Sequence, residues 1–276
     1  GDGQLVTCSD ERNSDLFNAI LGGMGQCGII VKVAMELVPA PTHVLFCVLS
    51  YPEWQSAITD LTLLVNDGRF SDVDGIAPAR PAGGFTYNLA CGAFHDAPNT
   101  PSESHLLANL RFASKSVKLI TYPEYYGRTP SIPAQLAHPW LHLCLPASKS
   151  VAYGNKVFST PAEIAFASPL LFSVWKTSRI KRPLTRVPTE DLAVRFQLLR
   201  RPPASFADVS SLVAMNRTLY ERARDIGGTR LTTTALPFSQ TDWIQYYGPV
   251  WESFQSAKKR FDPNNVLTPG HGIFPG

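Results

Sequence analysis

The sequence predicts an α+β fold whose main part is an antiparallel sheet covered by helices. Residues 44–93 carry the pattern strand, helix, strand, strand, which favours antiparallel pairing with the helices on one face. The chain has 276 residues, so about two domains of roughly 150 residues each are expected. Hydrophobic residues make up 44% of the chain and charged residues 17%, which is typical of a soluble globular protein with ordinary cores.

The first unit is a helix, a glycine-rich loop and a strand within Asn13–Pro41, NSDLFNAILGGMGQCGIIVKVAMELVPAP. Asn13 is expected to cap the helix with its side-chain oxygen, and the Gly22-Gly23 pair to supply the left-handed residue that ends it. Apolar residues then alternate over 29–37, which predicts a strand with one strongly apolar face. Two prolines, at positions 39 and 41, end this strand.

The loop matches G-x-G-x-x-G through Gly23, Gly25 and Gly28. A Rossmann dinucleotide site needs a strand before the glycines and a helix after them, so that the helix N-terminus faces the pyrophosphate. Here the order is reversed, and we reject that assignment. From the motif alone, the glycines are interpreted as allowing a tight turn and a close backbone approach.

The middle of the chain alternates between the two types of element. Apolar runs and period-two alternation predict strands near residues 44–50, 71–77, 85–93, 140–145, 170–176 and 192–198. Helical spacing of apolar residues predicts helices over residues 53–67, from about 98–102 to 115, and over 207–226. Two strand-helix-strand halves are therefore expected. The Pro- and Tyr-rich stretch 121–139 is interpreted as a long ordered loop, and long loops often carry function.

The tail predicts a helical face of aromatic residues from Trp243 to Phe261. Gly248-Pro249 must interrupt this helix, because proline lacks the donor that an interior turn needs. Ser239 and Asp242 have the spacing of a capping box and are expected to start the first piece.

Composition excludes several classes of function. The net charge of +3 and a pI near 8.6 are too mild to indicate nucleic acid or an acidic membrane surface as a partner. Five scattered cysteines without a C-x-x-C pair indicate neither a zinc site nor a disulfide framework. No run approaches the roughly 18 apolar residues of a membrane span, and no signal peptide is visible.

The chain opens at Gly1 with the hairpin-type turn Gly1-Asp2-Gly3 rather than with Met. Residues 4–8 are typical of the outgoing arm of such a hairpin, whose incoming arm would lie before Gly1. Upstream sequence is therefore expected to be missing.

Other motifs have a simpler interpretation than a site. The cluster Arg179, Lys181, Arg182 and Arg186 contains prolines and is interpreted as a solvated loop. The sequon at Asn216 falls within a predicted helix, which argues against glycosylation.

The histidine and hydroxyl residues outside the motifs above give no catalytic or metal pattern. His95 and His105 have no spacing that would place them on one metal, so no metal site is expected. Ser148, Ser173 and the threonine run 232–234 lie in no nucleophile-elbow context, which gives hydrolase chemistry no support.

Three stretches together resemble one known family. The opening GDGQLVTCSDERNSDLFNAILGGMGQCGIIVKVAMELVPAP is similar to the second half of the flavin domain of cytokinin dehydrogenases and related FAD-linked oxidases of the vanillyl-alcohol oxidase family. The closing FDPNNVLTPGHGIF resembles the C-terminal return of that domain, and HPWLHLCLPASKS at 138–150 resembles a stretch of the substrate domain. The resemblance implies FAD as the cofactor and three parts: residues 1–41 and 237–276 in the flavin domain, and 42–236 as a substrate cap.

The resemblance also implies candidate binding residues. The loop and first strand of the family lie along the adenine side of FAD, which implies contacts for Gly25, Gly28 and Ile30. His271 stands where the family typically has a glutamine at the isoalloxazine edge, and Thr233 approximately matches a tyrosine near the flavin. His138 and Trp140 belong to the segment that covers the reactive side of the flavin, and are interpreted either as a loop anchor or as substrate-facing.

The reaction that the resemblance implies is hydride transfer. In the family, a base takes the proton of a secondary amine while the neighbouring C–H delivers hydride to flavin N5, and the imine is then hydrolysed. The attachment histidine of the family's G-x-G-H-S loop and its aspartate base are both expected upstream of Gly1. No catalytic residue is therefore identified here, and the isolated chain is expected to be inactive.

The function predicted is thus the C-terminal part of an FAD-dependent oxidoreductase acting on a small amine or alcohol. A sugar or alcohol oxidase on the same fold is the alternative within this class, and a non-catalytic binding module without flavin is the alternative outside it. Because one wall of the flavin-domain core is expected to be missing, exposed apolar patches are predicted on helix 13–21 and on the tail. Compartment, electron acceptor and oligomeric state are not indicated.

Overall fold

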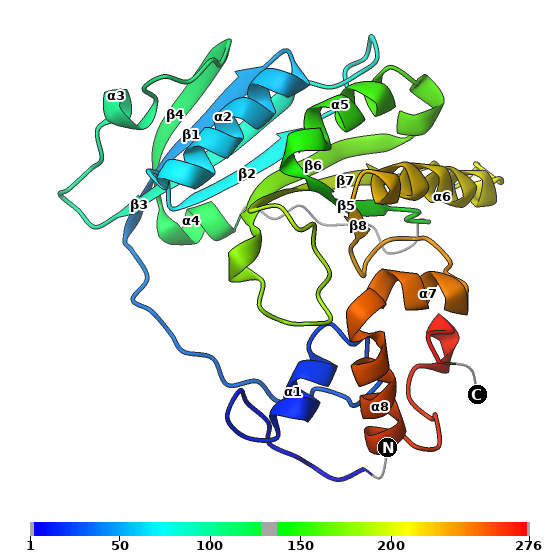
Figure 1. The fold of residues 1–276 in the computed structure, drawn as a ribbon. Coiled ribbons are helices and arrows are strands. Elements are labelled where there is room, and N and C mark those ends of the chain that lie inside the picture. Colours follow the sequence, from blue (N-terminus) through cyan, green and yellow to red (C-terminus); the bar gives the residue numbers. More distant parts are fainter. Residues whose placement is uncertain (1–2, 128–136, 275–276) are drawn as a thin grey trace.

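The computed structural model describes residues 3–127 and 137–274, and it has the predicted α+β fold. One antiparallel sheet of eight strands, in the order β4-β1-β3-β2-β6-β7-β5-β8, forms the upper half of the molecule (Figure 1). The strands are β1 His43–Tyr51, β2 Asp72–Ala77, β3 Tyr87–His95, β4 Ser114–Thr121, β5 Leu141–Pro146, β6 Ala167–Lys176, β7 Leu192–Arg200 and β8 Thr229–Arg230. The helices are α1 Ser14–Ile20, α2 Trp54–Asp67, α3 Glu103–Leu106, α4 Tyr122–Tyr126, α5 Ala147–Phe158, α6 Val209–Asp225, α7 Gln240–Tyr247 and α8 Trp251–Phe261.

The sheet consists of two halves with the same internal order. The first half runs β4-β1-β3-β2 from its edge, and the second runs β8-β5-β7-β6 from the other edge, so the halves meet where β2 pairs with β6. Each half begins strand, helix, strand, strand, as β1-α2-β2-β3 and β5-α5-β6-β7. The prediction of two strand-helix-strand halves is confirmed.

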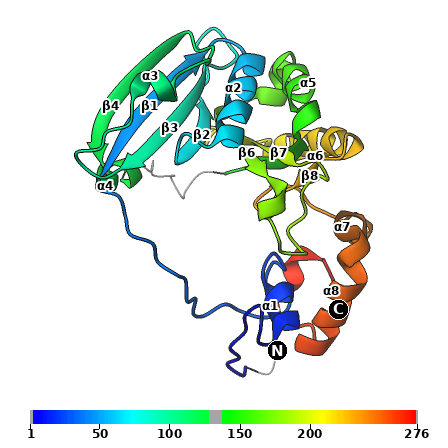
Figure 2. The same cartoon turned by 60° about the vertical axis from the view of Figure 1, so that its left-hand side comes forward.

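The two faces of the sheet have different surroundings. Helices α2, α5 and α6 cover one face, where alternate strand residues such as Leu49, Leu89, Phe172 and Phe196 are fully buried in the main core (Figures 1 and 2). The other face, which we call the open face, carries the intervening residues and is turned toward the lower part of the molecule (Figure 2).

The lower part has a hydrophobic cluster of its own. It joins α1, α7 and α8, with Leu16, Trp243, Tyr247 and Phe254 buried in it. Gly22, at φ +82°, provides the left-handed residue after α1, and Gly248 separates α7 from α8, both as predicted. Ser239 and Asp242 form the predicted capping box of α7.

The lower cluster also includes Leu184, from the loop between β6 and β7. From the same loop, Arg182 pairs with Asp10 and donates a hydrogen bond to Asn18 at 3.0 Å. The middle of the chain therefore contacts the opening segment directly. The three domain limits given above stay a prediction.

Two expectations fall wholly or partly outside the described residues. The turn expected at Gly1 and Asp2 lies outside them. The loop expected over 121–139 is only partly described: it begins with the short helix α4, which Thr121 caps, and residues 128–136 lie outside the described ranges.

Several local predictions are wrong. Residues 29–37 run extended but pair with no strand of the described chain, and their apolar side chains are exposed on both sides; Leu37 is 92% exposed. A strand needs a hydrogen-bonding neighbour as well as an alternating pattern, and this segment has none in the described ranges. Exposed large apolar residues lie on this segment and, in the tail, at Ile244 and Val266, whereas α1 and the tail aromatics cover one another.

Three further corrections concern caps and element types. Asn13 sits at φ +48° and turns its amide to the carbonyl of Thr7, at 2.9 Å, so its side chain makes no cap bond. The helix predicted up to residue 115 is only α3, and β4 follows as an edge strand that pairs with β1. Helix α5 was not predicted, since serine, glycine and asparagine are poor helix formers; Gly154 is required there because an added Cβ would lie 2.3 Å from Trp54 Nε1.

Over residues 3–127 and 137–274, no helix has the length and hydropathy needed to cross a membrane.

Candidate functional site

The glycine-rich loop and the C-terminal return together form a pocket of about 480 Å³. Three of the predicted cofactor residues, Gly25, Gly28 and Ile30, line it, together with Ile20, Ile29, Val266, Leu267 and Thr268. A Cβ at Gly25 would lie 3.0 Å from the side chain of Thr268, and one at Gly28 would lie 3.2 Å from that of Ile20. Glycine at these two positions therefore lets the loop approach Thr268 and Ile20 closely.

The backbone around this pocket is strained on both sides. Met24 has φ +51°, Gly25 has φ +75° and Thr268 has φ +44°. Non-glycine residues at positive φ cost free energy and are enriched at ligand sites. Gln26 locks the two sides together, since its Nε2 donates to Thr268 O at 3.0 Å and to Thr268 Oγ1 at 2.6 Å.

A buried ion pair holds the same two segments. Lys258 Nζ, on α8, donates to Asp262 Oδ2 at 2.6 Å, to Gln26 O at 3.1 Å and to Leu267 O at 3.1 Å, which uses all three of its protons. Asp262 accepts from the backbone N–H groups of Val266 and Leu267 as well. Burial opposes ionisation, but these hydrogen bonds outweigh it and hold the pKa of Asp262 below its ordinary value.

His271, the fourth predicted cofactor residue, lies three residues beyond Thr268 and is exposed. Its carbonyl accepts a hydrogen bond from Trp243 Nε1 at 3.1 Å, which fixes the backbone while the imidazole stays at the surface. It does not line the pocket formed by the glycine loop.

The other predicted residues meet at the sheet. His138 and Trp140 stack edge to face with ring centroids 5.0 Å apart, and Trp140 stacks on His142 at 5.7 Å with an interplanar angle of 22°. His142 Nδ1 is hydrogen-bonded to Thr233 Oγ1. We call these four residues the ring cluster. The structure thus brings together His138, Trp140 and Thr233, which were predicted for two different ligands.

The ring cluster contains three ring nitrogens without a partner. His138 Nε2, Trp140 Nε1 and His142 Nε2 are all buried, and none has a hydrogen-bond partner within residues 3–127 and 137–274. Buried polar atoms are nearly always paired in folded proteins. Three such atoms side by side make the ring cluster a candidate binding site.

His142 was missed at the sequence level. It lies on β5, opposite Gln197 of β7, and is 5% exposed. Burial and the neighbouring charge of Arg195 lower its pKa to about 4, so its ring is neutral near pH 7. The spacing of positions 138, 140 and 142 in HPWLH, which places them on one side of a strand, was the signal that could have found it.

Two buried polar residues position the ring cluster. Asn216 of α6, which is fully buried, donates to the carbonyls of Pro139 and Ala235, both at 3.1 Å, and accepts from Arg200. Its amide is therefore a structural tie between the His138 segment and the turn that carries Thr233. Its burial and bonding agree with the expectation that the sequon is not glycosylated.

Arg230 fixes the turn that carries Thr233 by hydrogen bonds to its backbone carbonyls. Its guanidinium donates to Leu236 O at 3.0 Å and to Thr234 O at 3.1 Å, and it lies over the rings of Phe238 and Trp243. Burial lowers its pKa. The backbone conformation at residues 231–236 is thus fixed by a side chain on β8.

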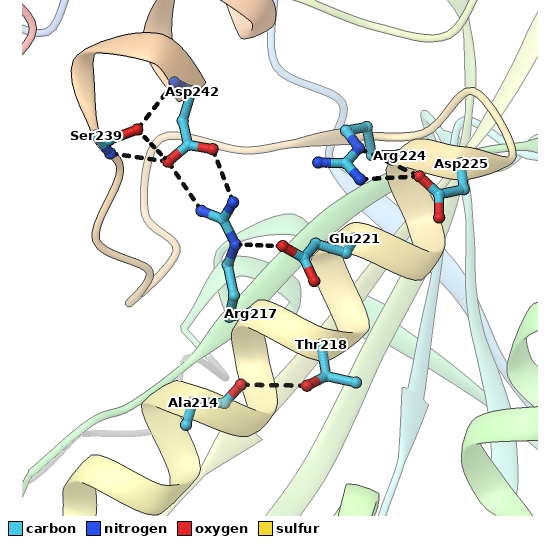
Figure 3. A network of polar contacts seen from close by, with 8 residues as sticks. All are labelled: Ala214, Arg217, Thr218, Glu221, Arg224, Asp225, Ser239 and Asp242. Atoms are coloured by element: carbon cyan, nitrogen blue, oxygen red, sulfur yellow. Dashed lines mark hydrogen bonds and ion pairs between the residues drawn. The ribbon is translucent and has the colours of Figure 1, made fainter.

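A polar network joins α6 to the start of α7 (Figure 3). Arg217 of α6 makes a bidentate pair with Asp242 at 2.7 and 2.9 Å and also bonds Glu221 at 2.7 Å. Hydrogen bonds from Arg217 and Ser239 hold the pKa of Asp242 well below its ordinary value. Asp242 also accepts the cap bond of Ser239, so α6 and the start of α7 are held at one point.

Further along the open face lies a charged pair that the sequence did not reveal. Asp74 of β2 accepts from Arg195 Nη2 of β7 at 3.0 Å, and the guanidinium of Arg195 lies 5.6 Å from the ring of Trp175. Partial burial raises the pKa of the Asp74 carboxyl, and Arg195 counteracts that rise. The Nε of Arg195 is buried and has no partner in the described part of the chain. The side chain of Asp74 is more than half exposed and is available to a cationic or N–H-bearing group.

The other constellations give no site. Ser173 is buried on the sheet, and Arg182 of the basic cluster pairs with Asp10 rather than with a ligand. No group of three or more histidine, cysteine or carboxylate residues suited to a metal ion occurs within the described ranges.

Known proteins similar to this chain include cytokinin dehydrogenases. A family model described as "Cytokinin dehydrogenase 1, FAD and cytokinin binding" matches residues 132–274, just over half of the chain. An oxidoreductase encoded by ORF5 in the fasciation locus of Rhodococcoides fascians is 29% identical over 98% of this chain, and cytokinin dehydrogenase 4 of Oryza sativa subsp. japonica is 28% identical over all of it. This chain spans 64% and 60% of their respective lengths.

Solved structures confirm the fold. The VAO-type flavoprotein MtVAO615 of Myceliophthora thermophila C1 superposes with a TM-score of 0.68 over 96% of this chain and 54% of its own, at 16% identity. The α+β architecture is therefore that of vanillyl-alcohol-oxidase-type flavoproteins.

Proposed function

Because the chain belongs to the family of cytokinin dehydrogenase FAD- and cytokinin-binding domains, we propose that it forms part of an FAD-dependent oxidoreductase acting on a small amine. The observation that carries the proposal is the set of three buried, unpartnered ring nitrogens at His138, Trp140 and His142. The chain spans about 60% of the length of its curated relatives, so the activity proposed is that of a whole protein to which these residues belong.

The pocket formed by the glycine loop fits the adenine side of FAD. Its lining is mostly apolar, its strained backbone is fixed from both sides by Gln26 and Lys258, and Gly25 and Gly28 leave room for a flat group. We propose that Gly25, Gly28 and Ile30 contact FAD there. When bound, FAD supplies the acceptor for a hydride, at flavin N5.

The ring cluster is proposed to receive the substrate and the reacting edge of the cofactor. The flat faces of Trp140 and His138 suit a planar ring system, and the neutral His142 offers one ring nitrogen without adding a charge that would have to be desolvated. Thr233 Oγ1 fixes the orientation of the His142 ring through Nδ1. Hydride transfer requires the protein to position the reactants in this way and to exclude water.

The charged pair favours an amine over a neutral sugar. The exposed carboxylate of Asp74 attracts an N–H donor or a protonated amine, and Arg195 holds that carboxylate in place and favours its ionised form. No residue of this chain is proposed as the base that removes the amine proton. His271 is proposed as a surface-facing contact for the edge of the flavin.

The test begins with the visible spectrum of the chain after incubation with FAD and removal of free flavin. Gly25→Ala is expected to weaken retention of FAD, because it adds a methyl group at φ +75° against Thr268. Gly68→Ala is the matched control, since Gly68 also has positive φ but ends α2 far from the pocket, with open space around it. Equal retention in the two variants would argue against this cofactor site.

Substrate class is then read from flavin bleaching without oxygen. A cytokinin is expected to bleach the bound flavin of the longer protein, whereas a sugar or a simple alcohol is not. Bleaching by the sugar alone would make the protein a sugar oxidase of the same fold. Failure of both the chain and the longer protein to retain flavin would favour a non-catalytic module.

A further inference from the structure

A second pocket, of about 440 Å³, lies at the end of the sheet where the turn between β2 and β3 meets the start of β6. Its lining includes Arg80, Gly84, Phe85, Phe166, Ser168 and Arg201. Phe85 and the adjoining Ala167 belong to the helix-covered core, so this pocket adjoins the helix side of the sheet rather than the ring cluster. Nothing in the proposed oxidoreductase function uses it.

The charge of this pocket has one sign. Its two charged lining residues are Arg80 and Arg201, and no carboxylate of the described residues lines it. In the part of the chain that the structure describes, neither arginine forms an ion pair. Arg201 Nε is buried without a hydrogen-bond partner in those residues. A buried guanidinium N–H without an acceptor is costly and calls for an anionic or strongly polar ligand.

The pocket is preformed. Arg80 is tethered by hydrogen bonds from Nε to Thr86 Oγ1 at 3.0 Å and from Nη2 to Pro52 O at 3.3 Å. On the other side, Arg200 donates to Glu163 O at 2.6 Å and to Ala165 O at 2.7 Å, which fixes the wall next to Phe166. Little ordering is therefore needed when a ligand binds, and preorganisation favours affinity.

Phe166 adds an unusual feature to that wall. It has φ +57° and is 38% exposed, and its ring packs on Phe206 with centroids 4.8 Å apart. Its carbonyl is held by the backbone N–H of Arg201 at 2.8 Å. A bulky residue at positive φ is rare and is a recurrent feature of ligand sites. Phe166 and Phe85 provide apolar walls beside the two positive charges.

We propose that this pocket binds a small organic anion, with a carboxylate or phosphate head between Arg80 and Arg201 and an aromatic or branched apolar body against Phe85 and Phe166. The planar guanidinium groups match such heads in geometry as well as charge. The volume lies within the range of about 300–1,000 Å³ that is usual for small-molecule sites.

The experiment is calorimetric or ligand-observed NMR titration of the full chain, without FAD, using benzoate and phenyl phosphate. Benzamide is the neutral probe of matched shape. We expect one of the two anions to bind, benzamide not to bind, and Arg201→Gln to weaken binding by at least about tenfold, since a charge-assisted contact is lost. The anion that binds more tightly identifies the head group.

Arg179→Gln is the matched control, because Arg179 is exposed and lies on a different loop. If Arg201→Gln fails to fold, Arg80→Gln carries the test, since Arg80 is exposed. Absence of anion binding in the unaltered chain, equal binding of benzamide, or an equal loss in Arg179→Gln would overturn the proposal. Because no flavin is present, the result does not depend on the oxidoreductase function.

Discussion

Replacing Lys258 by methionine tests the buried ion pair of Lys258 and Asp262 that holds the glycine-rich loop. Methionine has nearly the same length and shape, so the change removes the charge and three hydrogen bonds without opening a large cavity. The Lys258 side chain is 5% exposed and that of Asp262 is fully buried. The variant therefore leaves a buried carboxylate without its cation, and the carbonyls of Gln26 and Leu267 without a donor.

Breaking a buried ion pair by removing one partner costs about 3–5 kcal/mol. The two backbone N–H groups that still reach Asp262 place the expected loss at the lower end, about 3 kcal/mol, at pH 7. Without Lys258, the pKa of Asp262 is expected to rise, because burial then dominates. The difference between variant and parent should accordingly shrink as the pH falls and the carboxyl group is protonated.

The assay is urea unfolding followed by tryptophan fluorescence, since Trp243 and Trp251 belong to the same cluster as α8. Lys259→Met is the matched control, because Lys259 is the exposed neighbour on the same helix. A loss below about 1 kcal/mol in Lys258→Met, or the same loss in Lys259→Met, would refute the reasoning. A second measurement is flavin titration, in which Lys258→Met should bind FAD more weakly, because the Gln26 side of the pocket is released.

Three further predictions use other parts of the structure. Asn216→Ala should destabilise the chain by about 2 kcal/mol or more, because buried carbonyls lose their donor. It should also shift the tryptophan emission, because it changes the surroundings of Trp140. An unchanged spectrum and stability would contradict the role given to Asn216. The pKa of His142 is about 4 when folded and about 6.5 when unfolded. The free energy of unfolding should therefore fall as the pH drops from 6.5 to 4, by at most about 3 kcal/mol. His142→Gln should flatten this dependence, and an equally steep profile in that variant would contradict the assignment of the effect to His142. Limited proteolysis should cut first within residues 29–40, which are exposed and unpaired in the described structure; protection of this segment equal to that of the sheet would show that it is covered.

Six of the eight strands could be predicted because their signals are local, whereas β4 and β8 were missed. Strand β1 is a continuous apolar run, β3 and β7 alternate in sequence with period two, and the capping box of α7 is a four-residue pattern. Helix α5 could not be predicted, because its glycine is explained only by Trp54, 100 positions away in sequence. The alternating pattern at 29–37 predicts a strand, and that prediction is wrong because pairing depends on a neighbouring strand that no local pattern describes.

The candidate site likewise contains residues that a local sequence signal reveals and residues that only the tertiary structure reveals. His138, Trp140 and Thr233 were found through resemblance, and His142 could have been added from its spacing alone. The pair of Asp74 and Arg195 joins strands 121 positions apart, so only the register of the sheet reveals it. Buried groups without a partner, which mark the ring cluster and the arginine-lined pocket, are visible only when every neighbour is known.

Helix α6 explains why the two parts of the candidate site depend on one another. Asn216 and Arg217 are adjacent in sequence. Asn216 links the ring cluster to the turn at Thr233 by hydrogen bonds. Arg217 forms an ion pair with Asp242 at the start of α7 (Figure 3). The next residue of α7, Trp243, lies against Arg230 and holds the carbonyl of His271. A displacement of α6 would therefore move residues assigned to the substrate and a residue assigned to the flavin edge at the same time. The hydride transfer proposed above would tolerate only small changes in the distance between donor and acceptor. A single rigid helix that sets both positions would keep that distance fixed.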